Sequence, residues 1–377
     1  MSLKNEIAAE ARRLGFNLFG VTSPYTPPHY AVYEDWIEQR KHGEMGYLDT
    51  ERARKRRKDP SLILPGCQSI LVLGWPHAIP NLSPETPVSD SQRLNGRIAS
   101  YAWGEDYHDV IPASLQKLVA FIEERVGETI PNRWYTDTGP ILERDLAQQA
   151  GLGWIGKNTC LINPGQGSFF LLAEVFLGIK LEPDTPFDAD RCGTCTRCIE
   201  ACPTDCIQAN RTIDASQCIS YLTIELKGAI PRDIRSNVGN WVFGCDICQQ
   251  VCPWNQRFAD QVNSNQLDIP IEDPDLITEL TLTSIEFNRK FKDNPIKRAK
   301  RRGYLRNVAV ALGNSKSAAG IPQLTKSLAE DPEPLVRGHA AWALGRIGGE
   351  QAKQALEKAT LEEDPFVVEE IRFALGE

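Results

Sequence analysis

Apolar and polar residues follow two different patterns along the first half of the chain. Short apolar runs at residues 17–22 and 69–74 predict buried strands, whereas the apolar spacing over residues 1–14 and 111–125 predicts amphipathic helices. Residues 79–87 are rich in proline and polar side chains and predict an exposed loop. Because strands and helices are mixed as far as about residue 180, the pattern predicts an α/β or α+β domain there. Of the two we expect an α/β domain over residues 1–180, within a chain of the α+β class overall.

The pattern changes twice after that point. Residues 181–262 have little periodicity and many cysteines, which predicts a domain organised around bound clusters rather than a large apolar core. Residues 276–377 return to helical spacing, and Ala-Leu-Gly recurs from Ala311, Ala343 and Ala374, at intervals of 32 and 31 residues. This repeat predicts HEAT-like helical hairpins that lean on the rest of the protein, with a helical cap of no binding role as the alternative.

All but two of the 11 cysteines lie between Cys192 and Cys252. The run Cys192-x2-Cys195-x2-Cys198-x3-Cys202-Pro203 is typical of ferredoxins with two 4Fe–4S clusters, where the last cysteine binds the other cluster. A second run, Cys245-x2-Cys248-x3-Cys252-Pro253, is one cysteine shorter. Crossed ligation therefore assigns the first cluster to Cys192, Cys195, Cys198 and Cys252. The second cluster receives Cys202, Cys245 and Cys248, with Cys218 as its fourth ligand and Cys206 as the alternative.

Zinc sites and disulfides are the competing roles for these cysteines. Structural zinc sites also use Cys-x2-Cys pairs, but zinc does not need three such cysteines in register before a Cys-Pro. Disulfide frameworks belong to small secreted domains. Cys67 and Cys160 lie outside the cluster region and are expected to be ordinary buried thiols.

The net charge of −8 argues against nucleic acid as a partner, but the charge is unevenly distributed. Residues 52–58 are almost wholly basic, and residues 289–306 carry nine basic side chains against the single acid Asp293. Two such segments on an acidic protein indicate a binding surface for a polyanion. The N-terminus lacks the features of a secretion signal, and the longest apolar run, residues 169–177, is interrupted by Glu174. We therefore expect a cytoplasmic protein with no membrane role.

Four segments resemble the epoxyqueuosine reductases, cobalamin-dependent iron–sulfur enzymes that complete queuosine formation in the tRNA anticodon. They are residues 135–144, 151–159, 218–225 and 244–255, and the resemblance covers essentially the whole chain. It implies an oxidoreductase that converts epoxyqueuosine in the anticodon stem-loop to queuosine and water. It also implies electrons from a low-potential donor, such as a flavodoxin or ferredoxin system, that pass through both clusters to cobalamin in the N-terminal domain.

The resemblance also implies roles for individual residues. Asp137 is the expected proton donor, with its pKa raised by burial near the corrin and by an apolar wall such as Trp134 or Tyr135. Lys157 and Asn158, with the glycines around them, resemble a loop that contacts the cofactor. The further cofactor contacts carried over by similarity are Tyr101, Ser168, Phe169, Ser220, Tyr221 and Gly244.

Two motifs in this region match known cofactor-binding motifs only in part. The glycines from Gly151 to Gly156 have the spacing of a dinucleotide-binding loop, but they follow a helix-like stretch instead of a strand. Residues 106–111 begin like the Asp-x-His-x-x-Gly motif of other cobalamin proteins, yet Ile111 stands where glycine is needed. We expect His108 to be a surface or core histidine and the cobalt to have no protein histidine below it.

A tRNA substrate, which the resemblance implies, would account for the two basic segments. Single-stranded RNA is recognised through splayed bases and phosphate contacts. The residues expected to contact phosphates are Lys297, Arg298, Lys300, Arg301, Arg302 and Arg306, followed by residues 54–58. Two alternatives remain: a corrinoid enzyme like the reductive dehalogenases, acting on a small molecule, and a ferredoxin-type electron carrier on a helical scaffold.

Overall fold

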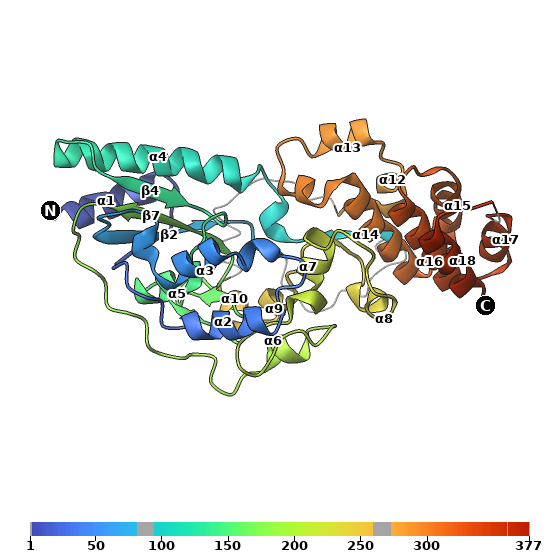
Figure 1. Cartoon of the computed structure of the whole chain (residues 1–377), viewed down its shortest axis with the longest axis horizontal. Helices are drawn as coiled ribbons and strands as arrows, with labels where there is room; N and C mark the ends of the chain where they lie inside the picture. The colour runs from blue at the N-terminus through green and yellow to red at the C-terminus, as the bar shows by residue number, and fades with distance from the viewer. Residues whose placement is uncertain (1, 81–93, 259–272, 360, 377) are drawn as a thin grey trace.

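The elements of the chain are arranged along one long axis. The structure, a computed structural model, describes residues 2–80, 94–258, 273–359 and 361–376. A sheet with its helices lies at one end, the helical repeats lie at the other, and the cysteine-rich segment lies between and below them (Figure 1). Most of the loop predicted at residues 79–87 falls outside the described residues.

A four-stranded sheet forms the centre of the N-terminal domain. Its strands are β1 (Leu18–Thr22), β2 (Ser69–Pro76), β7 (Phe170–Leu177) and β4 (Asn132–Tyr135), in that order. Every neighbouring pair is antiparallel. The strands predicted at residues 17–22 and 69–74 are confirmed, but the expectation of an α/β domain is wrong. Antiparallel strands need no helical crossover between them, so the helices lie outside the strand order and the domain is α+β.

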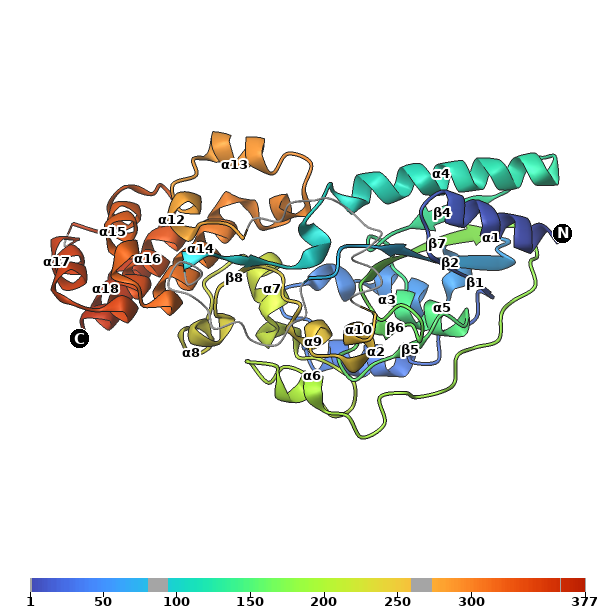
Figure 2. The ribbon, with the colours of Figure 1, turned by 180° about the vertical axis from the view of Figure 1, so that it is seen from behind.

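Helices cover both faces of the sheet. Two amphipathic helices, α1 (Leu3–Arg13) and α4 (Tyr107–Val126), pack on one face, as Figure 2 shows from behind. Leu71 and Leu73 of β2 point into their core, whereas Ile70 and Val72 point to the opposite face. That second face is covered by α5 (Glu143–Gln149). The uninterrupted apolar run in β2 follows from this burial on both sides.

Shorter elements complete this domain. On its lower side lie α2 (Tyr30–Glu38) and the basic helix α3 (Glu51–Lys58) (Figure 1). The remaining pieces are η1 (Gly46–Leu48), η2 (Pro60–Leu62), β3 (Arg97–Ile98), η4 (Ser100–Ala102) and the hairpin strands β5 (Trp154–Ile155) and β6 (Leu161–Ile162). Because the glycine-rich stretch at residues 151–156 leads into this hairpin, it does not open a helix as a dinucleotide-binding loop does.

The cysteine-rich segment is built from very short elements. From residue 178 the chain runs without helix or strand to α6 (Arg197–Glu200), along the lower edge of Figure 1. The elements that follow are η5 (Ala215–Gln217), α7 (Ile219–Ile224), α8 (Arg232–Arg235), η6 (Ser236–Val238), β8 (Trp241–Phe243), α9 (Ile247–Gln250) and α10 (Pro253–Gln256). Such short elements bury little apolar surface by themselves, as predicted for a segment organised around bound groups.

The C-terminal part consists of helices. Three of them, α14 (Lys300–Ser315), α16 (Pro334–Ile347) and α18 (Pro365–Leu375), pack in sequence, and the glycines of the repeated Ala-Leu-Gly make this possible. A Cβ atom added at Gly345 would lie 2.6 Å from the Cβ of Ala374. The other elements are α12 (Leu276–Glu279), α13 (Ser284–Lys290), η7 (Pro295–Ala299), η8 (Ala318–Gly320), α15 (Ile321–Glu330) and α17 (Glu350–Lys358).

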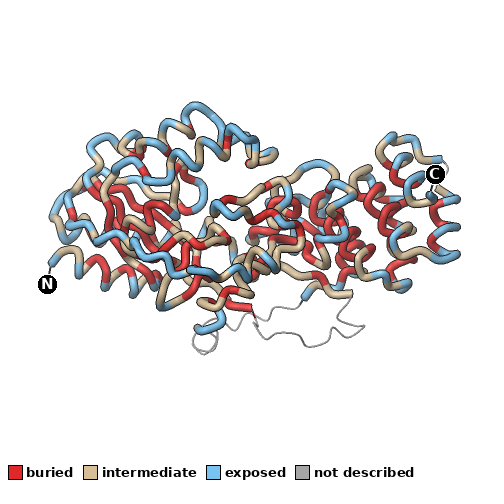
Figure 3. Tube along the Cα trace, turned by 90° about the horizontal axis from the view of Figure 1, so that it is seen from below, coloured by how far each residue is buried: buried red, intermediate tan, exposed pale blue. Residues whose placement is uncertain are grey.

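The helical repeats share one apolar core with the cysteine-rich segment. Buried residues from Leu222 and Phe243 through Leu344 belong to a single cluster, and Figure 3 shows the buried tube continuing between the two parts. Polar contacts also cross the boundary, since the Asn307 amide donates to the carbonyl oxygens of Thr223 and Val242, both at 2.8 Å. The prediction that the repeats lean on the rest of the protein is confirmed.

The hydropathy of the described helices bears on the membrane prediction. Across residues 2–80, 94–258, 273–359 and 361–376, no helix combines the length and apolar character that crossing a bilayer would require.

Candidate functional site

Four cysteines predicted to bind the first cluster lie in one neighbourhood. Burial and then the nearby thiols of Cys192 and Cys195 raise the pKa of Cys198. Burial raises the pKa of Cys252 to about 11, and the thiol of Cys192 adds to that increase. The indole N–H of Trp154 donates to the Cys192 sulfur at 3.4 Å. Loops far apart in the sequence therefore meet here.

The second group gathers around Cys206. The sulfur atoms of Cys202 and Cys206 are 3.4 Å apart. Hydrogen bonding to Cys206 lowers the pKa of Cys202 to about 5 and that of Cys218 to about 7. Burial, with the nearby thiols of Cys218 and Cys202, raises the pKa of Cys245. Since Cys206 lies among the predicted ligands, Cys218 and Cys206 both remain candidates for the fourth position.

Cys160 adjoins this second group, whereas the sequence predicts an ordinary buried thiol outside the cluster region. Contact with Cys248 lowers the pKa of Cys160, and contact with Cys160 raises that of Cys248. Cys67 differs, because its thiol donates to the carbonyl oxygen of Ser69 at 3.4 Å, at the start of β2. Because Cys160 is distant in sequence from the other cysteines, nothing in the sequence signals that it meets Cys248.

The cysteine geometry also bears on zinc and disulfides. All 11 cysteines lie in the described part of the chain and are free thiols, which argues against a disulfide framework. Within that same part, no three His, Cys, Asp or Glu side chains surround a point suited to a single metal ion.

Lys157 and Asn158 hold the cysteine loops together. The Lys157 ammonium donates to the carbonyl oxygens of Gly193 and Cys195 at 2.7 and 2.9 Å. The Asn158 amide donates to the carbonyl oxygen of Cys248 at 3.4 Å. The neighbouring glycines have a packing reason as well, since a Cβ at Gly153 would lie 2.1 Å from the carbonyl oxygen of Ile162. Their small size serves the β5–β6 hairpin, a reason other than the admission of a corrin.

Asp137 lies just after β4 with an exposed carboxylate. Its side chain is 65% exposed, and its backbone is left-handed, with φ at 58°. The Tyr107 hydroxyl donates to the carboxylate at 2.8 Å, and His108 Nε2 lies 3.7 Å from the same oxygen. His108 first and then Tyr107 hold the pKa of Asp137 below its usual value. In the protein alone the pKa is therefore lowered, because charged and polar partners surround the carboxylate; the increase expected beside a bound corrin stays a prediction.

His108 belongs to the site, contrary to the expectation of a surface or core histidine without a role. Its Nδ1 lies 2.8 Å from the Asp106 carboxylate, so one ring nitrogen faces Asp106 and the other faces Asp137. Hydrogen bonding to Asp137 and then to Asp106 raises the pKa of His108 against the effect of burial. The ring also stacks on Tyr107, with centroids 4.0 Å apart. The pattern Asp106-x-His108 is the available signal, but it suggests a cobalt-binding motif first.

Sequence reasoning missed two carboxyl groups behind Asp137. The Asp137 backbone N–H donates to Glu143 Oε1 at 2.8 Å, which holds the left-handed turn in place. Burial first and then the charge of Asp137 raise the pKa of Glu143 to about 8. Glu174 of β7 is fully buried beside it, and burial with the nearby Glu143 raises its pKa well above the usual value. Glu174 could have been found as the one acid inside an apolar strand.

Three of the other predicted cofactor contacts lie in two different places. Tyr101 and Gly244 lie near Asp137: a Cβ at Gly244 would be 3.6 Å from the Tyr101 ring, and Asp137 contributes after burial to the raised pKa of Tyr101. Ser168 is buried against the cysteine segment, where its hydroxyl donates to Gln249 at 2.9 Å.

The remaining three contacts are positioned differently. Phe169 is 3% exposed, which leaves it little surface for a ligand. The Tyr221 hydroxyl accepts the backbone N–H of Glu44 at 2.8 Å, and Ser220 precedes it in α7, partly exposed. Tyr221 therefore fixes a loop of the N-terminal domain.

The basic segment of residues 297–306 divides into exposed and internal side chains. Lys297, Lys300 and Arg302 are exposed, and Arg298 is half-exposed while paired with Glu225 at 3.0 Å. Arg301 is paired with Asp331 at 2.6 Å and is largely covered. Arg306 is fully buried, and its guanidinium donates to the carbonyl oxygens of Leu222, Leu226 and Gly228.

The expectation of a phosphate contact is therefore wrong for Arg306, because no RNA atom can reach it. Burial lowers the pKa of Arg306 to about 9. The charge of Arg298 reaches Asp137 and contributes to the lowered pKa of that carboxyl.

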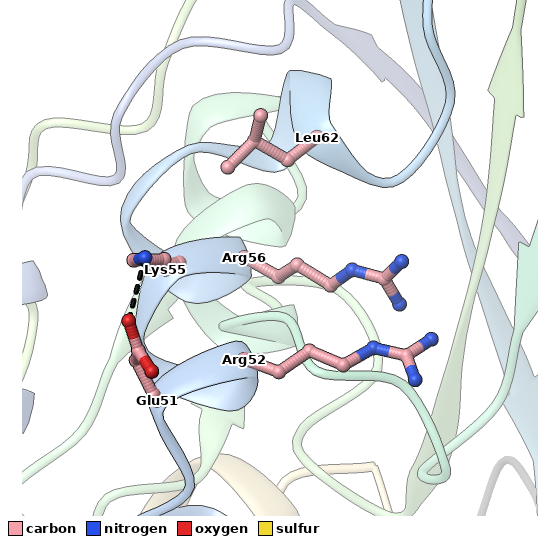
Figure 4. A pocket seen from close by; sticks show the side chains of 5 residues that line it. All are labelled: Glu51, Arg52, Lys55, Arg56 and Leu62. Atoms are coloured by element: carbon pink, nitrogen blue, oxygen red, sulfur yellow. Dashed lines mark ion pairs between the residues drawn. The ribbon is translucent and has the colours of Figure 1, made fainter.

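Helix α3 carries the second basic segment, and its side chains have several partners. Arg54 pairs with Asp49 at 2.6 Å, Lys55 pairs with Glu51 at 2.7 Å, and Arg57 is buried. Arg52 and Arg56 extend side by side from the helix, away from the Lys55–Glu51 pair (Figure 4). The hollow beside them, about 280 Å³ and lined by Glu51, Arg52, Lys55, Arg56 and Leu62, contains none of the residues around Asp137. It is a feature of the surface, separate from that site.

Together, an α+β domain, a segment with two groups of cysteines and a HEAT-like module are the parts expected of an iron–sulfur oxidoreductase with attached helical repeats. Three family models agree with this class. The 4Fe-4S double cluster binding domain matches residues 191–255, epoxyqueuosine reductase QueG matches residues 57–138, and HEAT repeats match residues 299–376. The protein therefore carries a domain for two 4Fe–4S clusters.

Curated relatives extend the match over most of the chain. The epoxyqueuosine reductase of Cyclobacterium marinum is 41% identical over 299 residues, covering 79% of this chain and 93% of the relative. That of Bacillus cereus is 33% identical over 380 residues, covering 99% and 97%. The chain belongs to the epoxyqueuosine reductase family and is an oxidoreductase.

Solved structures of the family have the same fold. A crystal structure of epoxyqueuosine reductase with a tRNA-Tyr epoxyqueuosine-modified tRNA stem loop is 32% identical, with a TM-score of 0.86, and covers 99% of this chain and 98% of that one. The Streptococcus thermophilus structure is 27% identical, with a TM-score of 0.85 and coverage of 100% and 99%.

Proposed function

We propose that this protein reduces epoxyqueuosine in tRNA to queuosine, the reaction that the names of its relatives describe. The observation that carries the proposal is the setting of Asp137. Its exposed carboxylate lies beside Tyr107 and His108, and the charge of Arg298 acts on it. A proton donor, an RNA-binding segment and a cluster-binding segment would then act at one place. Because tRNA is a cytoplasmic molecule, this activity would place the protein in the cytoplasm.

We propose cobalamin as the cofactor next to Asp137. Bound cobalamin would supply a strong reductant for a strained epoxide carbon. Tyr101 and Gly244 fit such a group: the partly exposed Tyr101 ring lies within reach of the Asp137 charge, and a Cβ at Gly244 would lie 3.6 Å from that ring. Ser220, partly exposed in α7, is a further proposed contact. The Tyr101 hydroxyl makes no hydrogen bond to any described residue, so it is free to meet a carboxamide of the corrin rim. Lys157 and Asn158 would act on the cofactor site indirectly, by holding the cysteine loops in position.

Asp137 would deliver the proton that the departing alkoxide needs. Its lowered pKa means that the carboxylate must first take up a proton, and His108 is the adjacent source. Cofactor and substrate would cover the exposed carboxylate, and the loss of water favours its neutral form. Asp106, bound to the other ring nitrogen, would stabilise His108 in its protonated state before the transfer.

The two sets of neighbouring cysteines would bind the two clusters of the electron relay. We assign Cys192, Cys195, Cys198 and Cys252 to one cluster. The other receives Cys202, Cys245 and Cys248, with Cys218 as the fourth ligand and Cys206 as the alternative. Cys245 follows Gly244, so the second cluster would be the one nearer to Tyr101 and Asp137. A low-potential flavodoxin or ferredoxin system would reduce the other.

The anticodon stem-loop would be held by the exposed part of the basic segment. Lys297, Arg298, Lys300 and Arg302 are available for phosphate contacts, whereas Arg301 is engaged by Asp331. Helix α3 could add Arg52 and Arg56. Arg298 would link this segment to the reaction, because its charge acts on Asp137.

The test is turnover by anaerobically reconstituted protein. Protein with and without cobalamin is incubated with reductant and either epoxyqueuosine-containing tRNA or a chlorinated phenol, and products are measured by mass spectrometry. We expect queuosine in the tRNA, only with cobalamin present. Dechlorination without queuosine formation would support the dehalogenase alternative, and no turnover of either substrate would support the electron carrier.

A further inference from the structure

The loop of residues 43–48 displays one aromatic side chain beside the site around Asp137. Tyr47 lies in η1, and its side chain is 55% exposed. Burial of its hydroxyl end, with the nearby charges of Glu225 and Asp137, raises the pKa of Tyr47 to about 12, while Arg298 and Arg57 act in the opposite direction. The loop contacts Tyr221 and Lys227, which flank the Glu225 that binds Arg298, so Tyr47 lies on the same side of the protein as Arg298, with much of its ring exposed.

The loop that carries Tyr47 is held rigidly at both ends. The Glu44 N–H donates to the Tyr221 hydroxyl at 2.8 Å, and the Lys227 N–H donates to Glu44 Oε2 at 3.1 Å. On the other side of Tyr47, the Tyr33 hydroxyl donates to the Leu48 carbonyl oxygen at 2.5 Å. These hydrogen bonds order the loop before a partner binds, so less conformational entropy is lost on binding.

One more contact tightens the loop. Gly43 has φ at 58°, and a Cβ there would lie 2.6 Å from the Tyr221 ring. A side chain at this position would therefore push the loop away from α7. The glycine allows the close approach that holds the loop of this exposed aromatic residue in place.

Charged side chains of both signs lie near the ring, and Arg298 is an exposed cation among them. Arg298 is half-exposed and bound to Glu225 through two contacts of 3.0 Å, which orient its guanidinium beside the site. Arg57 stacks on Tyr33 under the loop and is 7% exposed, and its Nη1 has no hydrogen-bond partner among the residues the structure describes. An aromatic face with fixed cations beside it is the arrangement that binds single-stranded nucleic acid.

We infer that Tyr47 is a stacking platform for the nucleotide next to the reacting nucleoside, with Arg298 contacting the phosphate between them. This inference rests on the proposed function. A nucleoside that leaves its stack to reach Asp137 exposes the base beside it, and the Tyr47 ring would cover that base again. Stacking accepts any base, so Tyr47 would strengthen binding without selecting sequence.

The experiment uses protein loaded with both clusters and cobalamin, and an anticodon stem-loop that carries epoxyqueuosine at the reacting position and 2-aminopurine beside it. Stacking on an aromatic ring changes the fluorescence of 2-aminopurine, so one titration gives both contact and affinity. The variants are Tyr47→Ala and Tyr47→Phe, with Tyr25→Ala as the control because Tyr25 is another exposed tyrosine, at 78%. Iron content and circular dichroism check that each variant is folded.

We expect Tyr47→Ala to bind about ten-fold more weakly or worse and to lose the fluorescence change. KM should rise while kcat stays close to the wild-type value, since the lost contact acts on ground state and transition state alike. Tyr47→Phe and Tyr25→Ala should behave like wild type. If Tyr47→Ala binds and changes the fluorescence as wild type does, or if Tyr47→Phe is as defective as Tyr47→Ala, the stacking role is wrong. Wild-type conversion of epoxyqueuosine in the same samples shows whether the proposed function itself holds.

Discussion

At the scale of single residues, the site depends on how Asp137 is held and charged. Tyr107 and His108 keep its carboxylate ionised in the free protein, while Glu143 fixes its backbone. The sequence alone indicated an acid at this position through the family resemblance. It could not give the sign of the pKa shift, because that depends on which side chains the fold brings within hydrogen-bonding distance.

Replacing Asp137 by asparagine should remove the proton donor and leave the fold intact. Asparagine can still accept the Tyr107 hydroxyl and has nearly the same shape. We expect turnover to fall about 100-fold to 10,000-fold, the usual contribution of a general acid, with unchanged iron content and tRNA affinity. Single-turnover formation of queuosine measures the effect, and Asp109→Asn, on the same helix as His108, is the control. A near-normal rate would remove Asp137 from its role.

The raised pKa of Glu143 predicts a dependence of stability on pH. The folded protein keeps this carboxyl protonated up to about pH 8, against a usual value of 4.5 for a free glutamic acid. The folded state thus binds more protons than the unfolded state between these values, so the free energy of unfolding should fall as pH rises from 4.5 to 8. Glu143→Gln should reduce this slope by at most about 1.4 kcal/mol per pH unit.

Thermal unfolding of the anaerobic protein at pH 5, 6, 7 and 8 measures this slope. Glutamine keeps an oxygen for the Asp137 N–H, so the loop should remain in place at pH 5. Equal slopes for the variant and the wild type would mean that Glu143 is ionised in the folded protein.

At the scale of elements, the basic segment shows what charge counting can and cannot predict. The sequence marked residues 297–306 as one cationic run, but a helix turns its residues to different sides. Arg306 therefore became part of the core and Arg301 an ion-pair partner of Asp331, while Lys297, Lys300 and Arg302 stayed exposed. The helices and repeats themselves were predictable, because apolar periodicity determines them locally.

Removing the three exposed charges should weaken tRNA binding in a salt-dependent way. For the variant with Lys297, Lys300 and Arg302 changed to alanine, we expect log Kd against log salt to lose about 0.7 to 0.9 of slope per phosphate contact removed. The matched control changes Lys316 and Lys326, two exposed lysines farther along the repeats. Filter binding at several salt concentrations gives the slopes. Identical slopes for wild type and variant would make this segment an ordinary solvated surface.

At the scale of the whole molecule, the repeats, the cysteine segment and the sheet meet near Asp137. The order of these parts could be predicted from the sequence, because each has its own composition and period. Their contacts could not: Tyr221 holding Glu44, Arg298 acting on Asp137 and Cys160 touching Cys248 all join residues far apart in the chain. The antiparallel order of the sheet was missed for the same reason, since local patterns do not state which strands pair.

The cluster assignment makes a prediction at this scale. Cys218→Ser should lose the second cluster, so that about four irons per chain remain after anaerobic reconstitution, whereas Cys206→Ser should keep about eight. Iron analysis and spin-resonance spectra of the reduced proteins measure the difference. The reverse result would make Cys206 the ligand and Cys218 its neighbour.

The most direct test is a single-turnover experiment in which the amounts of clusters, cobalamin and substrate are known. Protein carrying both clusters and cobalamin is reduced, freed of excess reductant and mixed with an epoxyqueuosine stem-loop, while corrinoid absorption and queuosine are followed together. We predict that queuosine forms in step with oxidation of the reduced corrinoid, and that cluster-loaded protein without cobalamin forms none. Queuosine formation at the same rate without cobalamin, or fully cluster-loaded protein that never binds the corrinoid, would contradict the account.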